Sequence, residues 1–169
     1  MTAGMELGTV GGIGQRSWIS AIRRYMAFVA VANLLWEFAH LPLYTLWLTA
    51  TAGEMAFAAV HCTGGDVLIA LASLMLALAT VGSARWPAER QWYVLALSLL
   101  FGLGYTIFSE WLNIEVRQVW AYRDIMPVVP LIETGLSPLL QWTVIPIAAS
   151  FWALRSNRVH AGQGREANA

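Results

Sequence analysis

Two ionisable residues stand three positions apart within an apolar run at residues 33–44, and they are the first candidates for chemistry. Glu37 and His40 are surrounded there by Leu, Trp, Phe and Ala. Ionisable side chains at membrane depth are costly, and they usually face a partner, a cavity or a ligand. The Glu-x-x-His spacing also presents a carboxylate and an imidazole on one helix face, as carboxylate metal sites in helix bundles do. Three roles remain open for the pair: metal ligation, proton or substrate binding, and hydrogen bonds that only fix helix packing.

The next predicted helix brings a second set of polar residues to a similar depth. At a rise of about 1.5 Å per residue, His40 and Glu37 lie about 12 and 16 Å below the outer end of their helix. On the same rise, His61 and Asp66 lie about 8 and 15 Å below the outer end of theirs. Helices joined by a short loop pack side by side, so we expect these four side chains to converge. His61 and Asp66 are five positions apart, about 140° round a regular helix, so they share a face only if the Gly-Gly pair between them distorts it.

These residues predict a polar site inside the membrane. Imidazole and carboxylate groups suit a divalent transition metal such as zinc or iron. The predicted metal ligands are Glu37, His40, His61 and Asp66. Without a cation between them, two neighbouring carboxyls hold a proton instead. The predicted catalytic acids are Glu37, Asp66 and Glu110, and the predicted supporting residues are Asn33, Tyr44, Asn113 and Gln141.

The composition assigns the chain to the membrane. Of its 169 residues, 58% are hydrophobic and only 12% are charged, whereas about a quarter of the residues of a soluble domain are charged. The chain has no lysine, which excludes Schiff-base chemistry, and a formal net charge of zero. Nucleic-acid binding needs a basic surface, so we expect no nucleic-acid partner.

Four apolar segments predict an all-α protein that crosses the membrane four times as a helix bundle. Each is long enough to span about 30 Å of hydrocarbon at about 1.5 Å per residue. The predicted spans are residues 25–48, 56–81, 91–113 and 136–154. The Pro-containing segment at 128–137 either lies along the membrane interface or bends into the bundle.

The arginines predict the orientation of this bundle. They concentrate in the two tails and in the second loop, and cytoplasmic segments carry an excess of positive residues. Residues 1–24 are therefore expected to form a cytoplasmic tail with a short surface helix at 16–23. Residues 25–155 form the transmembrane domain, and residues 156–169 form a disordered cytoplasmic tail. We expect a protein of the bacterial inner membrane whose polar site faces the outer, non-cytoplasmic side.

Several functions are compatible with such a site. The first is a metalloenzyme of hydrolase or oxidase type that acts on a lipid-like or amphipathic molecule. The second is a proton-coupled carrier, for which four helices imply a homo-oligomer. The third is a small subunit or assembly factor of a larger membrane complex. Haem ligation by His40 and His61 ranks last, because the nearby acids disfavour the apolar pocket that haem needs.

Overall fold

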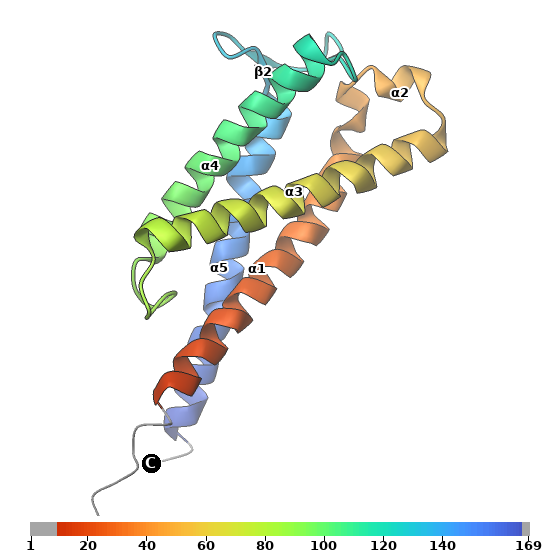
Figure 1. Ribbon diagram of the computed structural model, residues 1–169. Helices are drawn as coiled ribbons and strands as arrows, with labels where there is room; N and C mark the ends of the chain where they lie inside the picture. The colour runs from red at the N-terminus through yellow and green to blue at the C-terminus, as the bar shows by residue number, and fades with distance from the viewer. Residues whose placement is uncertain (1–9, 167–169) are drawn as a thin grey trace, which may run out of the picture.

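The protein is an all-α bundle whose four long helices can each cross a membrane. The computed structural model describes residues 10–166, and the side chains of residues 18–154 (Figure 1). The long helices are α1 (Val10–His40), α3 (Ala52–Val81), α4 (Gln91–Trp111) and α5 (Leu136–Glu166). The membrane-spanning segments are Trp18–Leu43, Ala52–Val81, Gln91–Val116 and Leu136–Leu154. The predicted fold class is confirmed.

Shorter elements gather at one end of the bundle, called the loop end below. They are the 3-10 turn η1 (Leu41–Leu43), α2 (Leu46–Thr49), the π-helical turn η2 (Leu112–Val116) and the strands β1 (Val128–Val129) and β2 (Thr134–Gly135). The two strands form an antiparallel hairpin, with Val128 opposite Gly135. The opposite end, called the terminal end, carries the connection at 82–90, the start of α1 and the end of α5 (Figure 1).

The first long helix differs from the predicted one at both of its ends. It ends at His40, because Pro42 lacks an amide hydrogen and the chain turns there into η1. Tyr44 is consequently extended (φ −109°, ψ 153°) and does not continue the helical stripe. At its other end α1 runs unbroken from Val10, through the segment expected to be a separate surface helix.

The last helix is longer than predicted. Residues 156–166, expected within a disordered tail, continue α5. The remainder of both predicted tails, residues 1–9 and 167–169, lies outside the described residues. Within residues 128–137 the two strands form the hairpin, which delivers the chain to Leu136, where α5 begins.

The four helices close into a ring. Helix α1 packs against α3 and α5, and α4 packs against the same two helices. Small residues bring the backbones close together on the terminal side of the ring. Those that are almost fully buried are Ala21, Ala70, Ala77, Ala149 and Ala153.

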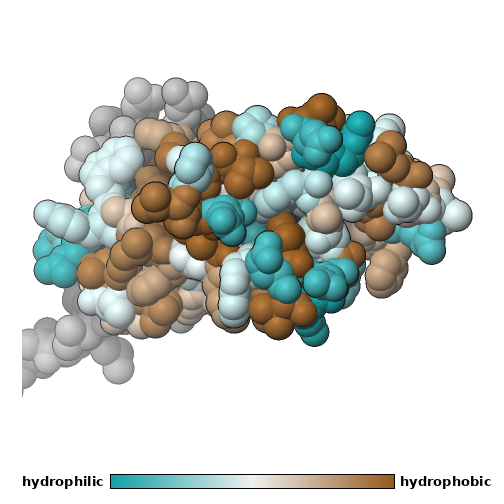
Figure 2. Space-filling model, turned by 90° about the horizontal axis from the view of Figure 1, so that it is seen from above, coloured by the Kyte–Doolittle hydropathy of each residue, from teal (hydrophilic) through white to brown (hydrophobic). Residues whose placement is uncertain are grey.

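The outer faces of the helices are apolar and exposed, as contact with lipid requires. Leu35, Phe57, Leu68 and Leu100 are each exposed by more than three-fifths. A protein in water would bury such side chains, whereas acyl chains solvate them. The view onto the loop end shows hydrophilic residues scattered among hydrophobic ones (Figure 2). The polar groups of the membrane spans instead lie largely inside the ring, where they form the site.

Candidate functional site

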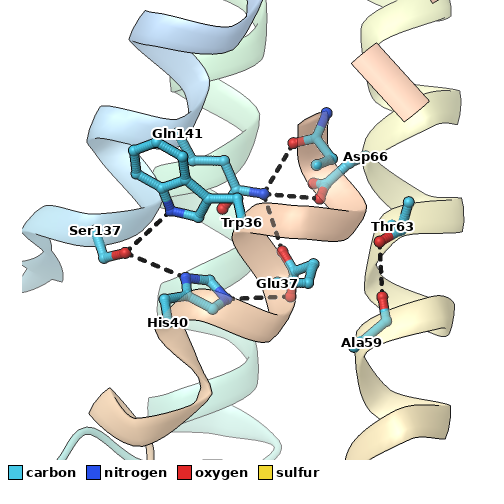
Figure 3. A network of polar contacts seen from close by, with 9 residues as sticks. Trp36, Glu37, His40, Ala59, Thr63, Asp66, Ser137 and Gln141 are labelled. Atoms are coloured by element: carbon cyan, nitrogen blue, oxygen red, sulfur yellow. Dashed lines mark hydrogen bonds and ion pairs between the residues drawn. The ribbon is translucent and has the colours of Figure 1, made fainter. Parts of the chain in front are cut away.

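A buried carboxamide on α5 connects three polar groups from two other helices. Gln141 is only 2% exposed. Its Nε2 lies 2.8 Å from Asn33 Oδ1, 2.9 Å from Glu37 Oε1 and 3.2 Å from Asp66 Oδ2 (Figure 3). Helix α1 supplies Asn33 and Glu37 one turn apart, and α3 supplies Asp66. The predicted convergence of Glu37, Asp66 and their supporting amides is therefore present.

The Gln141 amide has a limited number of hydrogens to donate to this cluster. Asn33 Nδ2 donates to the carbonyl of Val29 at 2.8 Å, so its amide oxygen faces Gln141 as an acceptor. That acceptor fixes the Gln141 amide with its NH₂ group toward the carboxyls. An NH₂ group has two hydrogens, and one of them goes to Asn33. Glu37 and Asp66 are then left to share the other.

The two acids lie beside each other. Glu37 and Asp66, called the carboxyl pair below, both reach the same nitrogen of Gln141, at 2.9 and 3.2 Å. Two neighbouring ionised carboxylates repel, and they have no hydrogen to place between them. One proton on the pair, or a cation beside it, removes both difficulties.

His40 links the carboxyl pair to the first turn of α5. Its Nε2 lies 3.1 Å from Glu37 Oε2, and its Nδ1 lies 3.2 Å from the hydroxyl oxygen of Ser137 (Figure 3). The indole N–H of Trp36 donates to the same hydroxyl oxygen at 3.2 Å. Since the Trp36 hydrogen occupies one acceptor position of Ser137, the hydroxyl can direct its own hydrogen at His40. The predicted Glu37–His40 pair is thus in contact, and it is tied to α5.

A second polar cluster lies between this site and the loop end. The Tyr122 hydroxyl donates to a carboxyl oxygen of Glu110 and accepts from the amide of Gly135 at 2.9 Å. Tyr44 bridges the two clusters, with its ring 5.1 Å from the His40 ring and 5.5 Å from the Tyr122 ring. Predicted residues Glu110 and Tyr44 therefore adjoin the site.

Both phenols of this second cluster are neutral at physiological pH. Burial raises the pKa of Tyr44 well above its usual value of 10, and the negative charge of Glu110 adds to that rise. Burial followed by the charge of Glu110 raises the pKa of Tyr122 as well. Each hydroxyl therefore keeps its hydrogen, and Tyr122 remains a donor to Glu110.

Backbone contacts hold the loop at 117–127 over this cluster. Thr45 N donates to Ala121 O at 2.9 Å, and Arg123 N donates to Leu43 O at 2.9 Å. The Arg123 guanidinium also donates to the carbonyl of Pro42 at 2.6 Å. The loop is thereby fixed to the turn that follows α1.

Two predicted residues stay outside the site. His61 is exposed on the outer face of α3, where its ring stacks on Phe57 at 5.6 Å. Helix α3 is unbroken, so the Gly-Gly pair does not distort it, and His61 points away from Asp66. Asn113 is buried, but its amide donates to Ser109 O of its own helix at 2.8 Å.

The donor set gives a metal ion little to bind. Within residues 18–154 there is no group of three or more His, Cys, Asp or Glu side chains that could hold one. His40 and the carboxyl pair already hydrogen-bond to each other and to Gln141. Zinc or iron bound by Glu37, His40, His61 and Asp66 remains a prediction, which the outward position of His61 does not favour. Elemental analysis of purified protein would test it.

Sequence reasoning missed the contact of Trp36. Its indole N–H donates to the Ser137 hydroxyl oxygen, which also lies 3.2 Å from His40 Nδ1. Its place beside Glu37 in the sequence is the signal that could have found it. The polar residues Ser137 and Gln141 of the last predicted span were expected to hydrogen-bond across the bundle, and both of them do.

No family model, curated protein or solved structure matches this chain. The fold and the site define it as a four-helix membrane protein with a buried cluster of carboxyl, imidazole and amide groups.

Proposed function

We propose that the protein is a proton-coupled carrier in which the carboxyl pair, Glu37 and Asp66, takes up and releases one proton. The observation that carries this proposal is that two carboxyls share one N–H of Gln141. The other hydrogen offered to the pair comes from His40 Nε2, and it reaches only Glu37. A shared proton supplies the missing hydrogen and lowers the negative charge in the membrane interior.

The groups facing the pair support proton binding. Helix α1 contributes His40, α3 contributes Cys62, α4 contributes Glu110, and the loop end contributes Tyr44 and Tyr122. Among the described residues around the pair, His40 is the only base that can carry positive charge. Uncompensated negative charge in the membrane interior is costly, so a proton on the pair is favourable.

The route to the pair leads through the loop end. Tyr44 and His40 stand between Glu110 and Glu37, and Tyr122 holds Glu110 beside the covering loop. The exposed Arg85 and Arg90 mark the terminal end as the cytoplasmic one under the positive-inside rule. The carrier thus takes its proton from the non-cytoplasmic side, and a homo-oligomer supplies the substrate path that four helices lack.

Infrared difference spectroscopy of the reconstituted protein tests proton binding directly. We expect a band from a protonated carboxylic acid at neutral pH that shifts in D₂O. Glu37→Gln and Asp66→Asn should each remove or shift it. The matched controls are Asp124→Asn and Glu133→Gln, which alter exposed acids and should leave the band unchanged. A wild-type spectrum without such a band, or a band that both site variants leave intact, would refute the proposal.

A second candidate function, ester hydrolysis, is favoured by one specific arrangement. Ser137 Oγ, the His40 ring and the Glu37 carboxyl form a continuous hydrogen-bonded line at 3.2 and 3.1 Å. A base aligned between a hydroxyl and a carboxylate is the arrangement that activates a serine nucleophile. Ser137 is half-buried beside the exposed Leu136 and Leu140, so a lipid ester could approach from the bilayer.

The chemistry of this candidate balances with water as the only co-reactant. Ser137 Oγ would bond to the acyl carbon while its hydrogen passes to His40, and the alcohol would leave with that hydrogen. Water would then release the acid and restore the hydroxyl. A fluorophosphonate probe tests this activity, because it should label the wild type and fail to label Ser137→Ala and His40→Ala. Equal labelling of Ser137→Ala, or none of the wild type, would eliminate the hydrolase.

A further inference from the structure

A small cavity lies on the terminal side of the bundle, separate from the carboxyl pair. It has a volume of about 30 Å³ and is lined in part by Tyr25, Gln91, Ser98 and Ser150. A cavity that can hold water needs about 10–15 Å³ and two to four polar partners. This one meets both requirements and has room for about one or two waters.

One helical turn of apolar residues separates this cavity from the site. On α1 the buried stripe reads Tyr25, Val29 and Asn33, so a single turn between two polar groups is apolar. The same sequence of polar, apolar and polar positions recurs on α4, where Gly102 lies between Ser98 and Thr106.

The other two helices complete this apolar layer. Helix α3 places the buried Ala70 one turn from Asp66, and α5 places the buried Ile145 one turn from Gln141. The apolar layer therefore consists of Val29, Ala70, Gly102 and Ile145. At about 1.5 Å per residue, its thickness is about 6 Å.

Gly102 is the smallest of these four residues, and the indole of Trp142 packs against it. A Cβ on Gly102 would lie 2.5 and 2.6 Å from the Trp142 ring atoms Cε3 and Cζ3. Trp142 is 5% exposed. Its ring thus rests directly on the α4 backbone. Glycine at 102 is required by this contact, because any side chain would displace the indole.

We propose that the cavity at Tyr25 and Ser98 is a second hydrated proton site, and that Trp142 on Gly102 is the barrier that separates it from the carboxyl pair. This inference rests on the proposed function. Protons move along hydrogen-bonded chains of water and hydroxyl groups, and a layer of aliphatic and indole carbon interrupts such a chain. The carboxyl pair therefore exchanges protons with the loop end while the Trp142 ring packs against Gly102. Displacement of Trp142 opens the route to the terminal end.

Proton flux into liposomes containing a trapped pH dye, driven by a potassium gradient with valinomycin, tests the barrier. Trp142→Ala removes the indole and should raise the flux at least tenfold above that of wild type. Trp142→Phe keeps an aromatic ring over Gly102 and should stay within about twofold of wild type. Gly102→Ala keeps Trp142 but places a methyl group where the indole packs, so this variant should also raise the flux. It provides the test of the barrier if Trp142→Ala fails to fold.

A second substitution, added to the Trp142→Ala variant, tests the role of the cavity. Tyr25→Phe combined with Trp142→Ala should return the flux toward that of wild type, because it removes a hydroxyl from the hydrated chain. A flux through Trp142→Ala that Tyr25→Phe leaves unchanged would eliminate the cavity as the route. Folded Trp142→Ala and Gly102→Ala proteins that do not leak would overturn the barrier.

Infrared spectra of the same preparations separate this inference from the proposed function. If the wild type lacks the band of the carboxyl pair, the proposed function fails. If the band is present and neither barrier variant leaks, only the further inference fails.

Discussion

Replacement of Gln141 by leucine is the most direct test of the hydrogen-bond network. Leucine is of similar size but has no donor, so Asn33 Oδ1 and the carboxyl pair lose contacts of 2.8 and 2.9 Å. A buried acceptor left unpaired costs about 1–3 kcal/mol. In membranes the measured value of one such bond averages about 0.6 kcal/mol and reaches about 1.7, because the unfolded chain also finds partners. For two lost bonds we expect a decrease of about 1–3 kcal/mol in the free energy of unfolding.

The assay is reversible unfolding in mixed micelles with increasing denaturing detergent, followed by circular dichroism. The matched control is Thr143→Val on the same helix, which removes a hydroxyl bonded only to the carbonyl of Leu139 in its own helix. We expect the control to lose less than about 0.5 kcal/mol. A double-mutant cycle with Asn33→Leu should show a coupling energy of about 0.5–1.5 kcal/mol between the two amides. If Gln141→Leu is no less stable than Thr143→Val, the network does not hold the helices together.

Two further predictions concern the outer face of α3 and the loop end. His61→Ala should change the free energy of unfolding by less than about 0.5 kcal/mol and leave the infrared band unchanged, because the ring is exposed. Loss of the band in this variant would show that His61 belongs to the site. For Tyr44 and Tyr122 the folded-state pKa is raised, so their contribution to stability is full below about pH 10 and is lost as the pH rises beyond it. An absorbance titration should show the phenolates of Tyr44 and Tyr122 only well above pH 10, and Tyr122→Phe should remove one of these two late-titrating groups. If both tyrosines titrated near pH 10, their buried positions would be wrong.

The apolar runs and the Glu-x-x-His spacing could be interpreted from the sequence without knowledge of any tertiary contact. The number of spans and the stripe of Asn33, Glu37 and His40 were predicted correctly, because helical periodicity places residues without reference to any partner. The end of the first helix was not predicted. Pro42 was visible in the sequence, but a proline in a membrane span can be accommodated as a kink. Here the chain turns instead, and Tyr44 reaches the loop at 117–127 through a β-bridge with Tyr122.

The sequence by itself determined that this is a four-span membrane protein with acids and imidazoles in its interior, because the cost of charge in hydrocarbon makes those residues conspicuous. It did not determine which of them meet. Only the tertiary structure decided that Asp66 joins Glu37 at Gln141 while His61 lies exposed on the outside of the bundle, because that outcome depends on how α3 is rotated about its own axis against α1. That rotation depends on packing between distant parts of the chain, as in the buried core that Ala70 shares with Trp142, and no local pattern records such packing.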